Sequence, residues 1–490
     1  MNMTAKKLRA QLNVETLEER WTPSVTSWNY NPSTGVLSAW CDNTASNVSI
    51  TRSGSTVTLY DSTNGFSRSV TGFVSKVQVV GGAANDRIVM YVPDLRLEAW
   101  GQGGNDYLEG YNANDYLNGG TGNDKLVGHG GNDLMFGGDG HDVLLGMAGN
   151  DQLVGGNGND RLNGGAGQDR MWGEAGDDVF IAIDDNYNDT IHTGSGRDIV
   201  WIDSRFGLND QVTDASSLDR VQRVSSFANG ADRTLNGDRI ADPNTLSGHT
   251  YKRFSGRELF SSVGPRGSDV IQGVQGGLAN CWLMAGFSAV ALDNPHAIRQ
   301  NVVDFDDGTY GVRLGNNFYR VDDDLPVTSS SATTPVYAQF GAEGSIWVAI
   351  MEKAYAHYRS GANSYASLEG GWSVEVNRAF RSTSAGERAI SSYSNATALA
   401  NNIYTRWNDY QAVTIGFAGG SIASGAPLVN NHMYTVWSVT RNRAGVVTSI
   451  TLRNPWGIDG AGSDGNNDGF VTVTPAQLFG STGRVNWGRV

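Results

Sequence analysis

The sequence is poor in cysteine, in long apolar runs and in basic residues. Two of its 490 residues are cysteines, Cys41 and Cys281, so a scaffold held together by several disulfides is excluded. No apolar stretch approaches the roughly 18 residues of a membrane-spanning helix, so no transmembrane segment is expected. Acidic residues outnumber basic ones by 50 to 36, for a formal net charge of -14, which disfavours nucleic acid as a partner and favours cations.

Changes in composition divide the chain into five predicted segments. We expect an N-terminal segment over 1–24, a β-rich lead-in over 25–99, a glycine-rich repeat block over 100–202, a polar linker over 203–244 and a globular domain over 245–490. Short alternating strands are predicted in the lead-in. It is either a small module of its own or an irregular start of the repeat block.

The N-terminal segment lacks an ordinary signal peptide, because Lys6, Lys7 and Arg9 are not followed by an apolar stretch. Its stretch LNVETLEERWTPS, from Leu12 to Ser24, resembles a short motif near the start of otherwise unrelated exported bacterial proteins. The same stretch also fits the start of an amphipathic helix. The sequence leaves both interpretations open.

Aspartate recurs at every ninth residue of the repeat block without a slip, at Asp106, Asp115, Asp124, Asp133, Asp142, Asp151, Asp160, Asp169 and Asp178. A large apolar side chain stands two residues after each aspartate, and glycines fill most positions before it, as in GGTGNDKLV and GGNGNDRLN. The pattern returns after a two-residue slip in DDNYNDTIH and TGSGRDIVW. A fixed period of this kind predicts a solenoid of stacked turns.

Hydrophobic burial alone does not account for the folding of this block. Fixing the backbone of one repeat costs very roughly 9–18 kcal/mol, whereas burying one leucine returns about 1.5–3 kcal/mol. Carboxylates and turn carbonyls at a fixed pitch suit calcium, and glycine permits the backbone angles that turn carbonyls inward. We therefore predict that the repeat aspartates bind a row of Ca2+ ions. The alternative is a metal-free solenoid whose aspartates only satisfy turn amides.

These nonapeptides resemble the RTX repeat, G-G-x-G-x-D-x-U-x. The resemblance implies a parallel β-roll with calcium in its glycine-rich turns and the apolar residue pointing inward. Weak calcium sites fill where calcium is near millimolar. A secreted or cell-surface location in a bacterium is therefore expected.

The stretch QGGLANCWLMAGFSAVAL, from Gln275 to Leu292, predicts a buried helix that begins at Cys281 with Asn280 as its N-cap. In the first turn of a helix, unpaired amides and the macrodipole favour a thiolate. The alternative is a buried structural thiol. Cys41, in SAWCDN, has no histidine near it in sequence and is expected to be unreactive.

His432 is the best candidate for a base among the seven histidines. It lies in VNNHMYTVWSVT, where alternating apolar residues predict a strand, and it follows Cys281 by 151 residues, close to the spacing in papain-like enzymes. His296 follows the same helix too closely, and His357 is placed at the exposed end of an amphipathic helix. Asn454, in LRNPWG, is expected to bond to the far nitrogen of His432 and fix the ring.

Most of residues 250 to 460 resembles the protease core of the calpain family. That family carries Q-G-x-x-x-x-C-W, a histidine on a later strand and N-P-W-G, which stand here at Gln275–Trp282, His432 and Asn454–Gly457. WVAIMEKAYA, SLEGGWS and VDDDLP are further likenesses. Asn280 and Asn431 depart from the family, which usually has aspartate and glycine there, and neither change is expected to alter the chemistry.

The resemblance implies a role for each site residue. Cys281 is the nucleophile, and His432 is the general base and then the general acid. Asn454 orients the imidazole, and Trp456 shields that hydrogen bond from water. Gln275 points its amide at the developing oxyanion beside the backbone N–H of Cys281.

The sequence therefore predicts a multidomain chain, in which a calcium-binding parallel β-roll is followed by an α+β papain-like cysteine protease domain. The expected function is calcium-dependent hydrolysis of protein or peptide substrates outside the cytoplasm, through a thioester. One alternative is a calcium-binding surface or matrix protein with a silent protease core. Another is a relative of the same fold that transfers acyl groups to amines.

Overall fold

The computed structural model describes residues 25–184, 187–205, 208–231, 240–260, 275, 277–340, 344–361, 363–458 and 468–490. Contacts between backbone segments divide the chain into two units, Met1–Arg223 and Val224–Val490, and each is described by itself. The predicted export motif at Leu12–Ser24 lies outside the described residues. None of the helices in the described ranges is long and apolar enough to cross a membrane.

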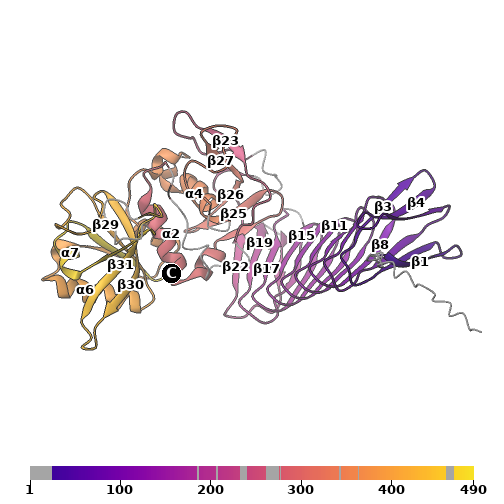
Figure 1. Ribbon diagram of the computed structural model, residues 1–490, viewed down its shortest axis with the longest axis horizontal. Helices are drawn as coiled ribbons and strands as arrows, with labels where there is room; N and C mark the ends of the chain where they lie inside the picture. The colour runs from indigo at the N-terminus through magenta and orange to yellow at the C-terminus, as the bar shows by residue number, and fades with distance from the viewer. Residues whose placement is uncertain are drawn as a thin grey trace, which may run out of the picture. The chain divides into compact units, whose positions relative to one another are not determined.

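The N-terminal unit is a β-solenoid whose strands stack in two sheets (Figure 1). In the described residues, the first sheet has ten strands. In sheet order they are β1 (Val25–Asn31), β2 (Val36–Cys41), β6 (Lys76–Val80), β8 (Arg96–Gly103), β10 (Tyr116–Thr121), β12 (Leu134–Asp139), β14 (Gln152–Asn157), β16 (Arg170–Ala175), β18 (Thr190–His192) and β21 (Gln211–Val212).

The second sheet of the solenoid has twelve strands within the part of the chain that the structure describes. They are β20 (Leu208–Asn209), β19 (Ile199–Arg205), β17 (Val179–Ala182), β15 (Arg161–Ala166), β13 (Val143–Ala148), β11 (Lys125–Gly130), β9 (Tyr107–Glu109), β7 (Arg87–Met90), β3 (Asn47–Ser53), β4 (Thr56–Asp61) and β5 (Phe66–Thr71), with β22 (Arg220–Val224) paired to β19.

Two nonapeptides make one coil of the solenoid. Parallel partners in the repeat block lie 18 residues apart, as in Leu117 with Met135 and Leu126 with Leu144. The apolar residue that follows each repeat aspartate is fully buried in one continuous core between the sheets. The prediction that the apolar residue points inward is therefore confirmed.

The solenoid extends beyond the repeat block on both sides. Strands β2 and β6 of the lead-in pair in parallel with each other, and β6 pairs with β8, so the lead-in continues the same sheets. Strands β21 and β22 lie within 203–244, where the sequence predicts a linker. They join the solenoid because its hydrogen-bond ladder continues there, from the amide of Asp189 to Asp210 Oδ1 at 3.0 Å.

The C-terminal unit combines helices with small antiparallel sheets (Figure 1). Its helices in the described residues are α2 (Cys281–Asp293), α3 (Pro295–Arg299), α4 (Trp347–Tyr358), α5 (Val374–Ala379), α6 (Ala396–Asn408) and α7 (Pro475–Phe479), with short 3-10 turns η2 (Arg359–Gly361), η3 (Tyr365–Leu368) and η4 (Ile390–Ser392). Strand β23 (Thr250–Arg253) pairs with β27 (Asp324–Val327).

Two further sheets complete this unit within the described ranges. Three strands form one of them, in the order β24 (Val302–Asp304), β25 (Thr309–Leu314) and β26 (Asn317–Asp322). Six strands form the other, in the order β28 (Gly386–Ala389), β33 (Arg484–Gly488), β29 (Ala412–Phe417), β30 (His432–Arg441), β31 (Val447–Arg453) and β32 (Phe470–Val473). The fold class predicted from the sequence, a parallel β-roll followed by an α+β protease domain, is confirmed.

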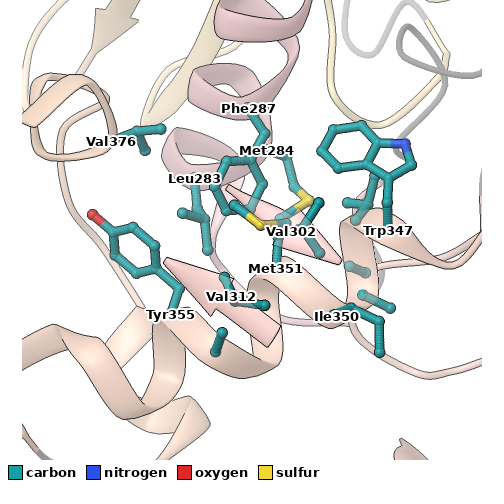
Figure 2. Packing of buried hydrophobic residues seen from close by; sticks show 14 of the residues in the cluster. Leu283, Met284, Phe287, Val302, Val312, Trp347, Ile350, Met351, Tyr355 and Val376 are labelled. Carbon is teal, nitrogen blue, oxygen red and sulfur yellow. The ribbon is translucent and has the colours of Figure 1, made fainter. Parts of the chain in front are cut away.

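Helix α2 is the centre of the C-terminal unit. Every residue from Trp282 to Ala291 is buried, as expected for a helix that is apolar on all sides. Leu283, Met284 and Phe287 pack against side chains of α4 such as Met351 (Figure 2). On another side the Thr435 hydroxyl of β30 donates to the Ala285 carbonyl at 2.9 Å, which fixes the helix against the six-stranded sheet.

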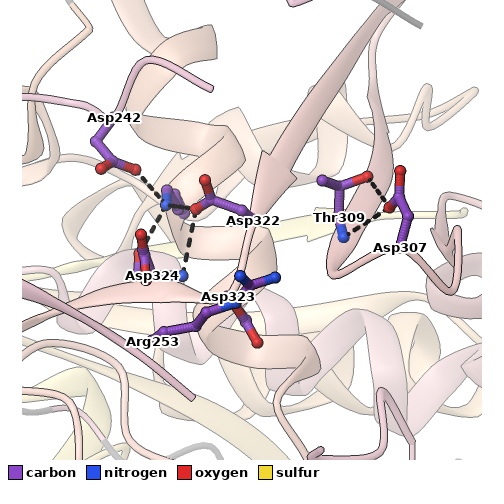
Figure 3. Close-up of polar contacts among 8 residues, drawn as sticks. Asp242, Arg253, Asp307, Thr309, Asp322, Asp323 and Asp324 are labelled. Carbon is purple, nitrogen blue, oxygen red and sulfur yellow. Dashed lines mark hydrogen bonds and ion pairs between the residues drawn. The ribbon is translucent and has the colours of Figure 1, made fainter. Parts of the chain in front are cut away.

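A buried ion cluster ties the segment before β23 to this unit. The amine of Lys353, which is fully buried on α4, pairs with Asp242 and Asp322 and donates to the Asp324 carbonyl at 2.6 Å (Figure 3). Asn244 adds backbone bonds to Asn363 and Tyr365 at 2.9 and 3.1 Å. The described end of the predicted linker is therefore a packed part of the C-terminal unit.

Candidate active site and metal centre

Cys281 is the first residue of α2, as the sequence predicts. Its thiol is free and partly buried. Backbone N–H groups of Met433, Trp282 and Cys281 itself bond to the sulfur and lower its pKa, but burial is the larger effect and raises it. The helix terminus therefore favours the thiolate as expected, while the surrounding protein reverses the net direction.

His432 begins β30 and bonds to Asn454, which directly follows β31. The distance from His432 Nε2 to Asn454 Oδ1 is 2.7 Å, and the same oxygen accepts the backbone N–H of Trp456 at 3.0 Å. Because Oδ1 accepts from Trp456, Nε2 carries the hydrogen, and Nδ1 is left for another partner. Burial lowers the pKa of His432 to about 4, although the bond to Asn454 opposes this shift.

The indole of Trp456 covers this pair. Its ring centroid lies 4.1 Å from that of His432, and both His432 and Asn454 are buried. The hydrogen bond between His432 and Asn454 therefore lies in a buried environment beside the indole.

The cysteine and the histidine strand meet at Met433. This residue follows His432, and its amide bonds to the Cys281 sulfur. The next residue, Tyr434, is close enough for Cys281 to raise the pKa of its phenol. The structure thus brings the start of α2 to the start of β30.

Gln275 lies between the turns that carry Cys281 and Asn454. Its backbone N–H donates to the Pro455 carbonyl at 2.8 Å, while its Nε2 donates to the Leu278 carbonyl at 2.6 Å. One of the two hydrogens on Nε2 is therefore engaged within its own loop rather than directed at an oxyanion. The sequence gives no signal for this bond, because it depends on the local path of the chain.

Asn431 explains one departure from the family pattern. Its backbone has a φ of 54°, a left-handed conformation that glycine adopts without cost and asparagine tolerates best among the larger residues. Its side chain accepts the N–H of Gly419 at 3.0 Å. The conformation at position 431 is therefore one that both asparagine and glycine can adopt.

The expectation for His357 is wrong. The residue is buried at the end of α4, not exposed, and its ring stacks on Tyr319 with centroids 6.4 Å apart. Burial lowers its pKa to about 4. The sequence pattern fails because β26 covers the helix face that it predicts to be solvated.

In the solenoid, each repeat aspartate uses its two oxygens differently. In all of them but Asp115, Oδ1 accepts the N–H of the aspartate one coil earlier, as in Asp106 to Asp124 at 2.7 Å. Asp115 Oδ1 accepts the N–H of Leu97 at 2.7 Å instead. The other oxygen, Oδ2, is buried without a hydrogen-bond partner in Asp106, Asp124, Asp133, Asp142, Asp151, Asp160, Asp169 and Asp178.

The space beside each of these oxygens fits a cation. A Cβ placed on Gly137 would lie 2.4 Å from Asp142 Oδ2 and 2.6 Å from the Gly155 carbonyl oxygen. A carboxylate and a carbonyl thus face one small space that only glycine leaves open, and both are hard ligands that suit calcium. No group of three His, Cys, Asp or Glu side chains placed to hold a metal occurs in the described residues, so a cation at these turns would need backbone carbonyls among its ligands.

Asp115 differs from the other eight predicted ligands. Its Oδ2 accepts the N–H of Tyr111 at 2.9 Å. Four residues before Asp124, Gly120 has a φ of 110°, and at the same place before Asp133, His129 has a φ of 71°. Tyr111 is absent from the positive-φ residues of the described chain, so its N–H turns into the space that the other turns leave open.

Two aspartates with the same geometry lie beyond the predicted row. Asp189 and Asp198 have buried, unpartnered Oδ2 atoms, and their Oδ1 atoms accept the amides of Asp169 and Asp178 at 2.8 and 2.9 Å. The sequence signal for these two aspartates is the return of the nonapeptide pattern in DDNYNDTIH and TGSGRDIVW, after the two-residue slip. Burial of these carboxylates raises the pKa of Asp198 to about 7 and that of Asp178 to about 8.

A cysteine at the start of a buried helix, beside a strand whose histidine bonds to an asparagine, is the arrangement of papain-like cysteine proteases. Residues 251–468 match the family model of the calpain family cysteine protease. The RTX calcium-binding nonapeptide repeat matches in four copies, at 99–117, 109–144, 145–180 and 181–201. The chain therefore carries a calpain-family cysteine protease domain preceded by RTX calcium-binding repeats.

Two curated relatives are distant. The calpain-1 catalytic subunit of Bos taurus is 28% identical over 266 residues, and that of Sus scrofa is 28% identical over 261 residues. Each match covers 47% of this chain and 34% of the relative. The chain thus spans about a third of the length of the curated relatives it matches.

Proposed function

We propose that this protein is a calcium-dependent cysteine endopeptidase that hydrolyses protein or peptide substrates outside the cytoplasm. Cys281 is the nucleophile, His432 is the proton carrier and Asn454 holds the imidazole. The observation that carries the proposal is the convergence of three chain segments. His432 is bonded to Asn454 at 2.7 Å, while the amide of the next residue, Met433, bonds to the Cys281 sulfur.

The reaction follows from these positions. The Cys281 sulfur attacks the substrate carbonyl carbon while its proton passes to Nδ1 of His432. His432 then gives this proton to the amide nitrogen as the C–N bond breaks, which leaves a thioester and a free amine. Water attacks the thioester with His432 as base, and the carboxylic acid leaves as the thiol is restored.

The oxyanion forms twice in this sequence. The backbone N–H of Cys281 and the second hydrogen of Gln275 Nε2 are the proposed donors to it. The tether from Gln275 to the Pro455 carbonyl supports this role, because it fixes the glutamine loop to the turn that carries Asn454. Trp456 keeps water from the bond that orients the imidazole.

Cys281 and His432 are both uncharged before the substrate binds. Burial raises the pKa of the Cys281 thiol and lowers that of His432 to about 4, so at neutral pH the thiol is protonated and the imidazole is neutral. Proton transfer therefore accompanies attack on the substrate instead of preceding it.

Calcium would be held by the repeat aspartates that keep an unpartnered Oδ2, together with carbonyls such as that of Gly155. When bound, calcium neutralises these buried carboxylates and links successive turns. Sites of this kind fill near millimolar calcium, which supports a location outside the cytoplasm.

The test is an assay of the full chain with casein and a labelled primary amine, with calcium or with a chelator. We expect released peptides and no incorporation of the amine. Changing Cys281→Ala should abolish cleavage and leave the circular dichroism spectrum unchanged. Cys41→Ala is the matched control and should cleave at the wild-type rate, because burial raises the pKa of Cys41 to about 12.

Cleavage by the Cys281→Ala variant would refute the assignment of the nucleophile. Incorporation of the amine would identify an acyl transferase instead. A chain that binds calcium and cleaves nothing would support the surface-protein alternative.

A further inference from the structure

Asn280 stands at the N-cap position of α2 but does not cap the helix. Its side chain makes no hydrogen bond to a helix amide. Instead Nδ2 donates to the carboxylate of Glu352, and Oδ1 is buried with no hydrogen-bond partner. An asparagine at this position ordinarily accepts the N–H of the second or third helical residue, here Trp282 or Leu283.

The partner of Asn280 comes from another helix. Glu352 lies on α4, is 2% exposed and is separated from Asn280 by 72 residues. Its second oxygen accepts the N–H of Ala338 at 2.9 Å. The titratable groups near this carboxylate are the phenols of Tyr337 and Tyr365, whose pKa values its charge raises.

Burying a carboxylate without a cationic partner destabilises the folded state. The presence of Glu352 here therefore needs an explanation other than stability. Lys353, its neighbour in sequence, is committed to Asp242 and Asp322. An apolar residue at position 352 would avoid the cost of desolvation. What Glu352 does in this place is to hold Asn280 away from the first turn of α2.

The N–H of Trp282, which Asn280 does not cap, has another hydrogen-bond partner. The N–H of Trp282 bonds to the Cys281 sulfur and lowers its pKa, while Leu283 bonds to the backbone carbonyl of Asn280 at 2.8 Å. If the Asn280 side chain capped the helix, its Oδ1 would compete with the sulfur for the N–H of Trp282.

We propose that Glu352 is a positioning residue for the nucleophile: it holds Asn280 off the helix terminus and so reserves the Trp282 amide for the Cys281 sulfur. This inference rests on the proposed role of Cys281. It assigns to α4 a share in the reactivity of the Cys281 thiol.

The test is the rate at which iodoacetamide alkylates Cys281 in the full chain with calcium, followed by mass spectrometry between pH 6 and 10. Glu352→Leu releases Asn280. We expect alkylation at pH 7.5 to fall about tenfold, which is a rise of about one unit in the thiol pKa. Alkylation of Cys41 in the same sample is the internal control and should not change.

Two further variants separate positioning from a merely structural effect. In Glu352→Gln, the new amide still accepts from Ala338 and donates to Asn280 Oδ1, so alkylation should stay within twofold of the wild type. In the double variant Glu352→Leu with Asn280→Ala, no side chain is left to compete for the Trp282 amide. Its alkylation rate should return to within threefold of the wild type.

A wild-type rate in Glu352→Leu would overturn the proposal. So would a double variant as slow as Glu352→Leu, and so would a tenfold loss in Glu352→Gln, which remains informative if the leucine variant does not fold. Because alkylation requires no substrate, a failure of the proposed proteolytic function would leave this test intact and would show separately in the casein assay.

Discussion

At the residue scale, the orientation of one amide decides what Gln275 contributes. The bond from its Nε2 to the Leu278 carbonyl leaves one hydrogen for the oxyanion. We therefore expect Gln275 to serve both the loop and the proposed reaction.

Changing Gln275→Ala should lower kcat by about 10²–10³ and alter KM little, because the oxyanion develops only in the transition state. Steady-state kinetics with a fluorogenic peptide measure both constants. Gln152→Ala, on an exposed position of the solenoid, is the control and should match the wild type. A Gln275→Ala variant with unchanged kcat would remove Gln275 from the proposed oxyanion site.

The turn conformation at Tyr111 distinguishes two aspartates that look alike in sequence. Asp133→Asn should reduce the number of calcium ions bound by the full chain, because Asp133 Oδ2 has no other partner. Asp115→Asn should leave that number unchanged, because its Oδ2 is already occupied by the Tyr111 amide. Equilibrium dialysis with labelled calcium counts the ions, and equal losses in both variants would contradict this distinction.

At the element scale, local patterns predict α2 and β30 well, but contacts between elements do not follow from them. The uninterrupted apolar run after Cys281 is enough to predict a buried helix, and alternation is enough to place His432 on a strand. The burial that raises the pKa of the Cys281 thiol depends on elements remote in sequence. The partnership of Asn280 with Glu352 likewise joins residues on different elements, so no local signal marks it.

Helix α4 carries a pH dependence of its own. Burial raises the pKa of Glu352 to about 7, against bonds from Ala338 and Asn280 that lower it, whereas the unfolded chain titrates near 4.3. Between these values the folded domain holds a proton that the unfolded chain has released. The contribution of protonated Glu352 to the free energy of unfolding is therefore complete below about pH 4.3. It is lost as pH rises through about 7, by up to about 1.4 kcal/mol per pH unit.

Calorimetry of the full chain with excess calcium should show this loss as a falling melting temperature of the protease transition from pH 4.5 to 7. Glu352→Gln has no proton to lose at this position, so its melting temperature should fall less across the same range. Parallel curves for the two proteins would mean that Glu352 is ionised in the folded state throughout.

At the scale of the whole molecule, the two units differ in what stabilises them. The C-terminal unit has apolar cores around α2 and in the six-stranded sheet. The solenoid has a narrow core of apolar side chains from both of its sheets, and buried carboxylate oxygens without partners at its turns. We therefore expect the folding of the solenoid, and not that of the C-terminal unit, to require a cation.

Removing calcium with a chelator at pH 7.5 should abolish the β signal of the solenoid in circular dichroism, because the buried Oδ2 atoms are then charged and unpaired. Limited trypsin digestion should then cut within Val25–Arg223 and spare a fragment close to Val224–Val490. Restored calcium should restore the spectrum. A chelated chain with an unchanged spectrum and no cuts in the solenoid would support the metal-free alternative.

The ladder of carboxylates and amides gives the solenoid a direction. Each repeat aspartate except Asp115 accepts the amide of the aspartate one coil earlier, and Asp115 accepts the amide of Leu97. The turns of each coil are therefore hydrogen-bonded by the coil that follows it. A chain that emerges from the ribosome or from a secretion channel with its N-terminus first can thus close each layer as the next arrives. Coils would then be added in order from the N-terminal end. Inserting a further 18-residue coil should lengthen the solenoid without changing the hydrogen bonds of the other coils.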